Sequence, residues 1–443
     1  SLAFVMSKSS STSLIDKIQK KEARIGIIGL GYVGLPLAVE FAQAGYHVVG
    51  IDTDSSKVDA LNRGDCYITD ISTELFSDMV STGRLMATQD YGAIGELDAI
   101  SICVPTPLRK TRDPDMSYVV AAAEQIAKHL RPSTLIILES TTYPGTTAEV
   151  VLPIMLGNGY VVGEDIFLAY SPERIDPANT TYGVRNTPKV IGGVTLECAD
   201  VAMALYDTVV EEVVKVSSTQ AAEMVKLLEN TFRAVNIGLI NEIAIMCDKL
   251  GIDVWEVIAA AKTKPFGYMP FYPGPGLGGH CIPIDPLYLS WKLKSLNFNA
   301  RFIELADEIN TNMPRYVVRK VAEALNEDSK PVRGSKVLIL GVAYKADVDD
   351  VREAPALDII QLLMQQGAIV NYHDPYVSSI QFDQVDISSV DHDMSILESV
   401  DCVIIVTDHS YYDWADILNH TNLVVDTRNA TVGLNGLARV VKI

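Results

Sequence analysis

The sequence has few basic residues and no long run of strongly hydrophobic residues. Among 443 residues, 36 are Lys or Arg and 56 are Asp or Glu, so the formal net charge is −20. Such a chain repels a phosphate backbone and an anionic membrane surface, and we expect neither nucleic acid nor a membrane as a partner. A local basic pocket for a small anion stays possible. A prominent uncharged run, residues 25–39, is too short and too rich in glycine to span a bilayer.

Cysteines are also few, and their spacing is typical of neither a disulfide framework nor a metal site. The six stand at positions 66, 103, 198, 247, 281 and 402, without a CxxC pair. A chain of this length does not need disulfides to stabilise its core, and reduced thiols are typical of a cytoplasm. The first residues show no pattern of a secretory signal. We therefore expect a cytoplasmic protein with reduced cysteines and no metal.

Short apolar runs alternate with helical patterns in the first half of the chain, and the same texture returns in its last quarter. The composition, with 48% hydrophobic and 21% charged residues, is that of a globular protein. The alternation is typical of a parallel sheet with helices on both faces. We expect strands over residues 24–28, 47–52, 99–104, 134–139, 167–170 and 189–192, and again over 336–342, 369–374, 402–407 and 423–426.

A long helix is expected between these two regions. Residues 219–250 contain no proline and place apolar residues at helical spacing, which predicts one helix of about 48 Å with Gly238 as its weak point. A helix of this length is more typical of a connection between domains than of a layer on a sheet. The glycine- and proline-rich residues 263–288 break the pattern, and further helices are expected to about residue 326.

These patterns together predict an α/β protein. We expect two Rossmann-like, doubly wound domains joined by the long central helix and a helical middle domain. At about 150 residues a domain, the length agrees with three domains. We place them at residues 1–217, 218–326 and 327–443.

The strongest local motif is a GxGxxG from Gly29 to Gly34, between a predicted strand and a predicted helix. Gly29 allows the tight turn, Gly31 lets backbone amides approach a pyrophosphate, and Gly34 permits close helix–strand packing. Asp52 ends the next strand, where a carboxylate can accept from a ribose 2′-OH and repels a 2′-phosphate. The motif predicts NAD rather than NADP. The alternative is a glycine-rich turn that only packs a helix on a strand.

Two further strand ends are expected to contact the cofactor. Ligands of open α/β sheets lie at the carboxyl ends of strands, and Thr106 and Thr141 each follow a predicted strand. The predicted NAD site therefore comprises Gly29, Gly31, Tyr32, Val33, Gly34, Asp52, Thr106 and Thr141.

A cysteine in the glycine-rich segment 278–285 is the candidate nucleophile. A substrate can approach Cys281 closely there, and Asp285 could turn back into the same pocket. The alternative is a buried free cysteine, which we expect for the other five. In an extended segment His280 points away from its neighbour, so we expect it to shape the loop rather than to act as a base.

Residues on the long helix and after one strand complete the candidate site. Lys226 and Asn230 are four residues apart and share a helix face, where two donors could hold an oxyanion. Glu173 follows a predicted strand, again at a carboxyl edge. A solvated surface lysine and an exposed loop glutamate are the respective alternatives.

These motifs, in this order, resemble the UDP-sugar 6-dehydrogenases from about residue 24 to the C-terminus. The resemblance rests on seven segments: 29–34, 104–107, 139–141, 171–174, Lys226 with Asn230, 278–285, and Tyr344-Lys345 with Arg352. Residues 271–285 are most similar to the bacterial UDP-N-acetylglucosamine branch, which serves O-antigen or capsule synthesis, and Arg174 resembles the N-acetylhexosamine enzymes as a group. Ile284 stands where the UDP-glucose branch usually has lysine. The UDP-N-acetylmannosamine enzymes share much of the pattern.

The resemblance implies oxidation of a primary alcohol at C6 to a carboxylate, with two NAD⁺ reduced in sequence. Cys281 would attack the intermediate aldehyde, and oxidation of the thiohemiacetal would give a thioester that water cleaves. Lys226 and Asn230 would stabilise negative charge on oxygen, and Asp285 would assist proton transfer. Which group is the base at each step stays open. The implied catalytic residues are Cys281, Lys226, Asn230, Asp285, Glu173 and Thr141, the last two orienting water and substrate.

The resemblance also implies a C-terminal domain that binds the UDP-sugar and, lacking a second GxGxxG, no second NAD. Lys345 would meet the phosphates, and Tyr344 would pack near the sugar nucleotide. Arg352 would reach toward the cofactor, unless it pairs with Asp349 or Glu353. The implied substrate-binding residues are Glu173, Arg174, Lys226, Asn230, Tyr272, Gly276, Gly279, Tyr344 and Lys345.

A homodimer or higher oligomer is expected, because the long helix has spare apolar surface and the family self-associates. Residues 218–326 would form the interface and contribute to catalysis. Two other functions stay open. One is a non-catalytic nucleotide-sugar or NAD sensor, against which Lys226, Cys281 and Asp285 argue. The other is a one-step β-hydroxyacid dehydrogenase, which would need no cysteine and would give one NADH per product.

Overall fold

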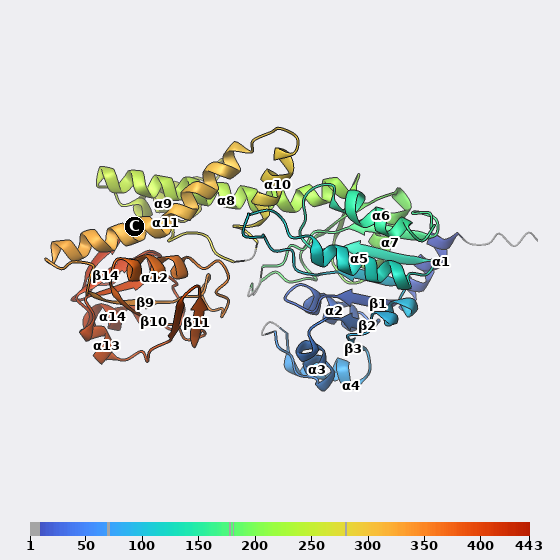
Figure 1. Cartoon of the computed structure of the whole chain (residues 1–443), viewed down its shortest axis with the longest axis horizontal. Helices are drawn as coiled ribbons and strands as arrows, with labels where there is room; N and C mark the ends of the chain where they lie inside the picture. Colours follow the sequence, from blue (N-terminus) through green and yellow to red (C-terminus); the bar gives the residue numbers. More distant parts are fainter. Residues whose placement is uncertain (1–8, 69–70, 177–178, 180, 280) are drawn as a thin grey trace, which may run out of the picture. The chain divides into compact units, whose positions relative to one another are not determined.

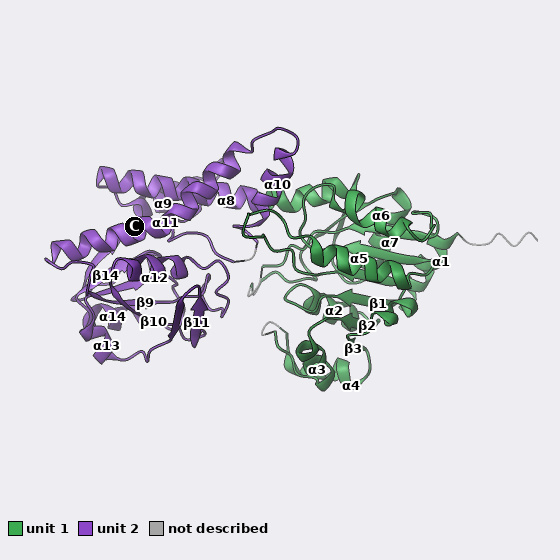
Figure 2. Ribbon diagram, viewed as in Figure 1, with its two compact units in different colours: residues 1–229 green, residues 230–443 purple. Residues whose placement is uncertain are grey.

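The structure is a computed structural model that describes residues 9–68, 71–176, 179, 181–279 and 281–443. The chain divides into two compact units, residues 1–229 (unit 1) and 230–443 (unit 2) (Figure 2). One continuous helix, α8 (Thr219–Leu250), contributes to both. None of the helices in the described part of the chain combines the length and hydropathy of a membrane span.

Unit 1 is built on an eight-stranded sheet of order β3-β2-β1-β4-β5-β6-β7-β8. Its strands are β1 (Arg24–Ile28), β2 (His47–Ile51), β3 (Leu85–Thr88), β4 (Ala99–Ile102), β5 (Thr134–Leu138), β6 (Ile166–Tyr170), β7 (Lys189–Gly193) and β8 (Val213–Val216). Its helices are α1 (Ser10–Gln19), α2 (Gly34–Gln43), α3 (Ser55–Arg63), α4 (Thr73–Ser81), α5 (Ser117–His129), α6 (Leu152–Leu156) and α7 (Leu196–Tyr206), with short helical segments η1 (Tyr91–Glu96) and η2 (Thr147–Val151). Helix α2 lies beside β1 and β2 (Figure 1).

Apolar side chains cover both faces of this sheet. In β1, Ile25 and Ile27 enter a core with α1, α2, α4 and α7, whereas Ile28 enters a second core with α5 and α6. Strands β1 to β6 are parallel, which confirms the expected doubly wound arrangement. Strand β7 is antiparallel to β6, because residues 171–188 contain no described crossover helix, and β8 is parallel to β7.

Unit 2 contains a five-stranded parallel sheet of order β10-β9-β13-β14-β15 and a two-stranded hairpin. The strands are β9 (Lys336–Leu340), β10 (Ile369–His373), β13 (Cys402–Ile405), β14 (Leu423–Asp426) and β15 (Arg439–Lys442), and the hairpin is β11 (Ser379–Phe382) with β12 (Val385–Ser388). The helices are α9 (Val254–Ala261), α10 (Asp285–Lys294), α11 (Arg301–Glu327), α12 (Pro355–Gln365), α13 (Met394–Ser399) and α14 (Trp414–His420). Helices α11 and α12 cover one face of the sheet, and α13 and α14 cover the other.

The two sheets share one turn geometry. In unit 1 the order β2-β1-β4-β5 matches β10-β9-β13-β14 in unit 2. After β1 and β9 the chain turns at glycines with positive φ, +93° at Gly29 and +81° at Gly341. Their N–H groups donate to the last residues of the neighbouring strands, Ile51 (2.8 Å) and His373 (2.9 Å). The second Rossmann-like domain expected from the sequence is thus confirmed.

Helix α8 has the bounds predicted from the sequence. Gly238, which we expected to weaken the helix, is instead the residue at which α8 crosses α11. A Cβ at Gly238 would come within 3.1 Å of Ala306 Cα in α11, so the missing side chain lets the two helices approach. Nearby, buried Asn310 of α11 donates to Ala234 O (3.1 Å) and accepts from Asn241 (2.9 Å). Helices α8 and α11 therefore form a tightly joined helical middle.

Candidate active site

The turn between β1 and α2 has the geometry that a dinucleotide requires. An added Cβ at Gly34 would collide with the carbonyl oxygen of Gly29, so α2 packs directly on the turn. An added Cβ at Gly31 would meet nothing within 4 Å, which leaves open space in front of its backbone. The exposed Tyr32 and half-buried Val33 border this space. The turn therefore fits a pyrophosphate at the N-terminus of α2.

Asp52 lies beside this turn, at the carboxyl end of β2. Its Oδ2 accepts from Leu30 N–H (2.8 Å) and its Oδ1 from Asp54 N–H (2.9 Å). The carboxylate is half-buried and keeps lone pairs for a ribose hydroxyl. Tyr67 donates to Leu30 O (2.7 Å). Burial and the nearby Asp52 raise the pKa of Tyr67, so the phenol keeps its proton and supports the turn.

A serine joins the two other strand ends of the predicted NAD site. Ser140 Oγ donates to Val104 O at 2.7 Å. The bond ties the segment after β4 to the segment after the neighbouring strand β5. Thr106 and Thr141 are both half-buried on these segments. The structure thus brings the two threonines to one edge of the sheet, as the motifs predicted.

Sequence reasoning missed a buried charge cluster at this edge. Lys189 Nζ lies 2.6 Å from Glu139 Oε2 and 3.5 Å from Glu173 Oε2, and all three residues are buried. Burial raises the pKa of Glu139, and the Lys189 ammonium opposes that rise. Although burial alone lowers it, the two carboxylates raise the pKa of Lys189 above its ordinary value. The signal available in the sequence was a lysine opening an otherwise apolar strand.

Glu173 is therefore not the exposed loop residue of the alternative interpretation. Its Oε1 accepts from the N–H groups of Arg174 and Ile175, both at 2.7 Å. Its Oε2 faces Lys189 and has no hydrogen bond within the part of the chain that the structure describes. The side chain shapes its own loop and retains one oxygen for a further donor.

Two carboxylates on α8 tie its first turns to loops at the same edge. Glu223 is buried and accepts from the Thr147 N–H (2.9 Å) and hydroxyl (2.7 Å). Two turns later, Glu229 pairs with Arg174, with 2.7 Å between Oε1 and Nη2. Arg174 also donates to Pro188 O (2.8 Å). The stretch of α8 between the two anchors is thus held against the loops that follow β5 and β6.

Lys226 lies between these anchors, and only 7% of it is exposed. The surface-lysine alternative is therefore wrong. The structure describes no hydrogen bond or ion pair for its ammonium. A buried ammonium without a partner is costly unless a ligand supplies oxygen atoms. One turn later on the same helix face, Asn230 Nδ2 donates to Asp285 Oδ2 at 2.5 Å.

Cys281 and Asp285 are joined by one turn of chain. The N–H groups of Ile284 and Asp285 donate to Cys281 O at 3.1 and 2.7 Å, and Asp285 begins α10. Cys281 is half-buried, as a reactive thiol requires. The predicted burial of the other cysteines is wrong for Cys66, which is also half-buried, and right for Cys103, Cys198, Cys247 and Cys402. His280 lies outside the described residues.

The glycine-rich loop before Cys281 packs on the loop after β9. A Cβ at Gly278 would lie 2.6 Å from Tyr344 Cβ, and one at Gly279 would lie 2.9 Å from the Tyr344 ring. Gly279 N–H donates to Arg352 O at 2.9 Å. Gly276, with φ +140°, lies against Pro355. The predicted substrate residues Gly276, Gly279 and Tyr344 thus gather in one cluster, beside the half-buried Lys345.

Two predicted site residues have other partners in the structure. The Arg352 guanidinium pairs with Asp350, with 2.6 Å between Nη2 and Oδ2, and this acid is neither of the two considered from the sequence. Tyr272 stacks on Trp255 of α9, with ring centroids 6.2 Å apart.

Three family models match the chain in order. The NAD binding domain of the UDP-glucose/GDP-mannose dehydrogenase family matches residues 23–210, its central domain matches 220–312, and its UDP binding domain matches 338–432. The chain therefore belongs to the UDP-glucose/GDP-mannose dehydrogenase family, a family of NAD-dependent nucleotide-sugar dehydrogenases. The expected family, NAD cofactor and nucleotide-sugar substrate class are confirmed.

Relatives within the family act on several UDP-sugars. The UDP-N-acetyl-D-mannosamine dehydrogenase of Methanococcus maripaludis is 35% identical, over 88% of this chain and 87% of the relative. The UDP-N-acetyl-D-glucosamine 6-dehydrogenase of Pseudomonas aeruginosa is 36% identical, over 81% and 84%. The solved structure of UDP-D-ManNAc dehydrogenase from Pyrococcus horikoshii superposes with a TM-score of 0.85 at 33% identity, covering 94% of this chain and 98% of that chain.

We expect Lys189→Met to destabilise the protein by about 3–5 kcal/mol at pH 7, because two buried carboxylates lose their cation. Without that cation, the pKa of Glu139 in the folded state rises further above its unfolded value. The folded state then binds more protons than the unfolded state, so the stability of the variant falls as the pH rises from about 5 to 8. Urea unfolding at several pH values measures this dependence.

Lys215→Met is the matched control. Lys215, like Lys189, lies on a strand of unit 1, and the substitution removes its more exposed ion pair with Asp200. We expect a loss below about 1 kcal/mol at every pH. Equal losses in the two variants, without pH dependence, would show that the buried cluster has no special electrostatic role.

Proposed function

We propose that the chain is a UDP-N-acetylhexosamine 6-dehydrogenase that converts the C6 alcohol of its substrate to a carboxylate. One observation carries the proposal: a half-buried cysteine in a glycine-rich loop lies one turn from Asp285, whose carboxylate contacts Asn230. A one-step dehydrogenase has no use for such a thiol, and a sensor needs no nucleophile. NAD⁺, when bound, accepts the hydride in each of the two oxidations.

In this proposal Cys281 Sγ adds to the C6 aldehyde that the first oxidation produces. The thiohemiacetal retains the aldehyde, loses a second hydride and becomes a thioester. Water cleaves the thioester, which gives the acid and restores the thiol. Lys226 and Asn230 donate to the C6 oxygen as it becomes negative, and Asp285 relays a proton. Thr141 and Glu173 orient the substrate and the hydrolytic water.

In this proposal the three domains have different roles in cofactor binding, substrate binding and catalysis. We assign NAD binding to residues 1–217 and UDP-sugar binding to residues 327–443, and the matches to NAD binding and UDP binding domains support both. Residues 218–326 contribute catalytic side chains and the oligomer interface. Arg352 is assigned to the cofactor. The proposed substrate-binding residues are Glu173, Arg174, Lys226, Asn230, Tyr272, Gly276, Gly279, Tyr344 and Lys345.

The configuration of the hexosamine has two candidates. UDP-N-acetyl-D-glucosamine, which would give UDP-N-acetyl-D-glucosaminuronate for surface polysaccharide, is favoured by residues 271–285, whereas Arg174 fits either epimer. UDP-N-acetyl-D-mannosamine is the second candidate, because the Methanococcus and Pyrococcus relatives are UDP-N-acetyl-D-mannosamine dehydrogenases.

A parallel assay of four substrates tests the proposal. We expect NADH formation with UDP-N-acetylglucosamine above that with its manno and galacto epimers and with UDP-glucose, and two NADH per molecule of product. Absorbance gives the NADH yield, and mass spectrometry identifies the acid. One NADH per product would indicate the one-step dehydrogenase. No turnover with any UDP-hexose would favour the sensor.

Substitution of the nucleophile tests the covalent step. We expect Cys281→Ser to reduce kcat for acid formation on the order of 10³-fold or more, because the aldehyde is no longer retained. NAD affinity should stay unchanged. Cys66→Ser, at the other half-buried cysteine, is the control and should retain full activity. Normal acid yield from Cys281→Ser would refute the thioester mechanism.

We also propose that α8 forms an interface between copies of the chain. Phe232, Leu239 and Met246 recur every seven residues along the helix, and about half of each side chain is exposed. Leu250 continues the stripe and is exposed at 71%. A recurring apolar stripe on a helix surface is typical of a helix that packs against another copy.

The double variant Leu239→Asp, Met246→Asp should convert the oligomer to monomers, because two charges at the interface remain desolvated without partners. Light scattering gives the molar mass, and circular dichroism checks the fold. Leu437→Asp is the control, since Leu437 is highly exposed but lies outside α8. A monomeric wild type would contradict the proposal.

A further inference from the structure

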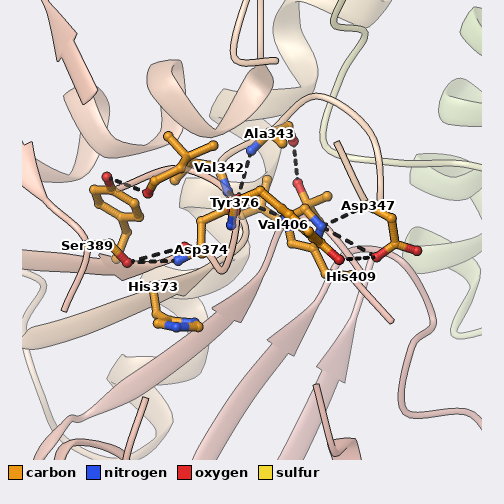
Figure 3. A network of polar contacts seen from close by, with 12 residues as sticks. Val342, Ala343, Asp347, His373, Asp374, Tyr376, Ser389, Val406 and His409 are labelled. Carbon is orange, nitrogen blue, oxygen red and sulfur yellow. Dashed lines mark hydrogen bonds and ion pairs between the residues drawn. The ribbon is translucent and has the colours of Figure 1, made fainter. Parts of the chain in front are cut away.

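A buried histidine–aspartate pair lies beneath the loop that follows β9 (Figure 3). Asp374 follows β10 and His409 follows β13, the two strands that flank β9. Their exposed fractions are 3% and 0%. His409 Nε2 lies 2.8 Å from Asp374 Oδ2. Neither residue belongs to a motif, so sequence reasoning named neither as a candidate.

The pair holds the loop at both ends. At the first end, Asp374 Oδ2 accepts from the N–H groups of Val342 (2.7 Å) and Ala343 (3.1 Å). At the other end, the Asp347 N–H donates to His409 Nδ1 at 2.9 Å. The three bonds enclose Tyr344 and Lys345, the residues assigned to the nucleotide-sugar. The loop is thus connected to the sheet on either side of these two residues.

The hydrogen bonds determine the charges of the pair. Because His409 Nδ1 accepts from a backbone N–H, the ring proton is on Nε2, which donates to Asp374. Burial alone would raise the pKa of Asp374. The hydrogen bonds from His409, Val342 and Tyr376 outweigh burial and hold that pKa below its ordinary value. A neutral imidazole therefore bridges a buried carboxylate and the far end of the loop.

Asp347 adopts a conformation that the loop alone would not favour. Its φ is +61°, in the left-handed region that is costly for a residue with a side chain. Its Oδ1 accepts from the Ser410 N–H (2.8 Å) and hydroxyl (2.9 Å). Residues 409 and 410 therefore hold both the backbone and the side chain of Asp347.

The corresponding acid of unit 1 has a different environment. Asp52 follows β2 as Asp374 follows β10, and each accepts from the turn after the neighbouring strand. Asp52 is half-buried and keeps room for a ribose. Asp374 is enclosed, and the buried ring of His409 contacts its Oδ2. Asp52 in unit 1 is thus accessible to a ligand, whereas the corresponding Asp374 in unit 2 holds only a loop.

We propose that His409 and Asp374 are positioning residues for the nucleotide-sugar. They hold residues 342–347 so that Tyr344 and Lys345 meet the substrate, and they act only through this loop. The inference rests on the proposed function, which assigns these two residues to the UDP-sugar.

The test compares UDP and NAD binding by calorimetry on the full chain. His409→Ala removes the acceptor for Asp347 and the donor to Asp374. We expect the Kd for UDP and the KM for the UDP-sugar to rise about tenfold or more, with the Kd for NAD unchanged and kcat changed less than KM. His409→Gln, whose carboxamide carries one acceptor and one donor, should recover part of the UDP affinity.

His373→Ala is the matched control. It removes another buried histidine of the same unit, whose Nδ1 lies 3.0 Å from the Tyr412 hydroxyl. We expect lower stability with the UDP affinity of the wild type. Unchanged UDP affinity in His409→Ala, or an equal loss in His373→Ala, would overturn the inference. If His409→Ala does not fold, a His409→Gln variant with weakened UDP affinity and wild-type NAD affinity supports the inference, and one with wild-type UDP affinity, or with NAD affinity weakened as much as UDP affinity, overturns it. A wild type that binds NAD but no UDP would instead refute the proposed function.

Discussion

In each unit, carboxylates that accept backbone N–H groups shape loops that hold candidate site residues. Asp52 does so for the turn after β1, Glu223 for the loop after β5, Glu173 for the loop after β6, and Asp374 for the loop after β9. A loop that is irregular because it must face a ligand cannot satisfy its own N–H groups as a helix or strand does. The charged acceptor satisfies them and gives the loop one conformation.

The burial of these acidic side chains explains how a chain with a negative net charge can bind an anionic substrate. The net charge of −20 argues against a polyanionic partner, but Glu139, Glu173, Glu223 and Asp374 are all buried and paired or hydrogen-bonded. At physiological salt, exposed charges are screened beyond about 8 Å. A bound diphosphate therefore responds to the charges near it more than to the net charge of the chain.

The sequence patterns predicted the features that depend on residues close together in the sequence. The bounds of β1, β14 and α8 agree with the sequence prediction, because apolar periodicity ends there at turn-forming or polar residues. Strand β8 escaped notice because its residues are half-buried or exposed, and β15 because it is short and partly exposed. The GxGxxG turn, Cys281 and Lys226 were found because their chemistry shows in their immediate neighbours. The Lys189–Glu139 pair and the His409–Asp374 pair join residues 50 and 35 positions apart, so no motif contains both members.

The boundary between the two compact units falls inside α8, directly after Glu229. Lys226 thus belongs to one unit and Asn230 to the other, yet a single helical turn separates them, with a rise of about 6 Å. Their spacing comes from the helix alone, independent of the orientation that the units adopt. A single rigid rod therefore keeps these two candidate donors at a constant separation along the helix axis.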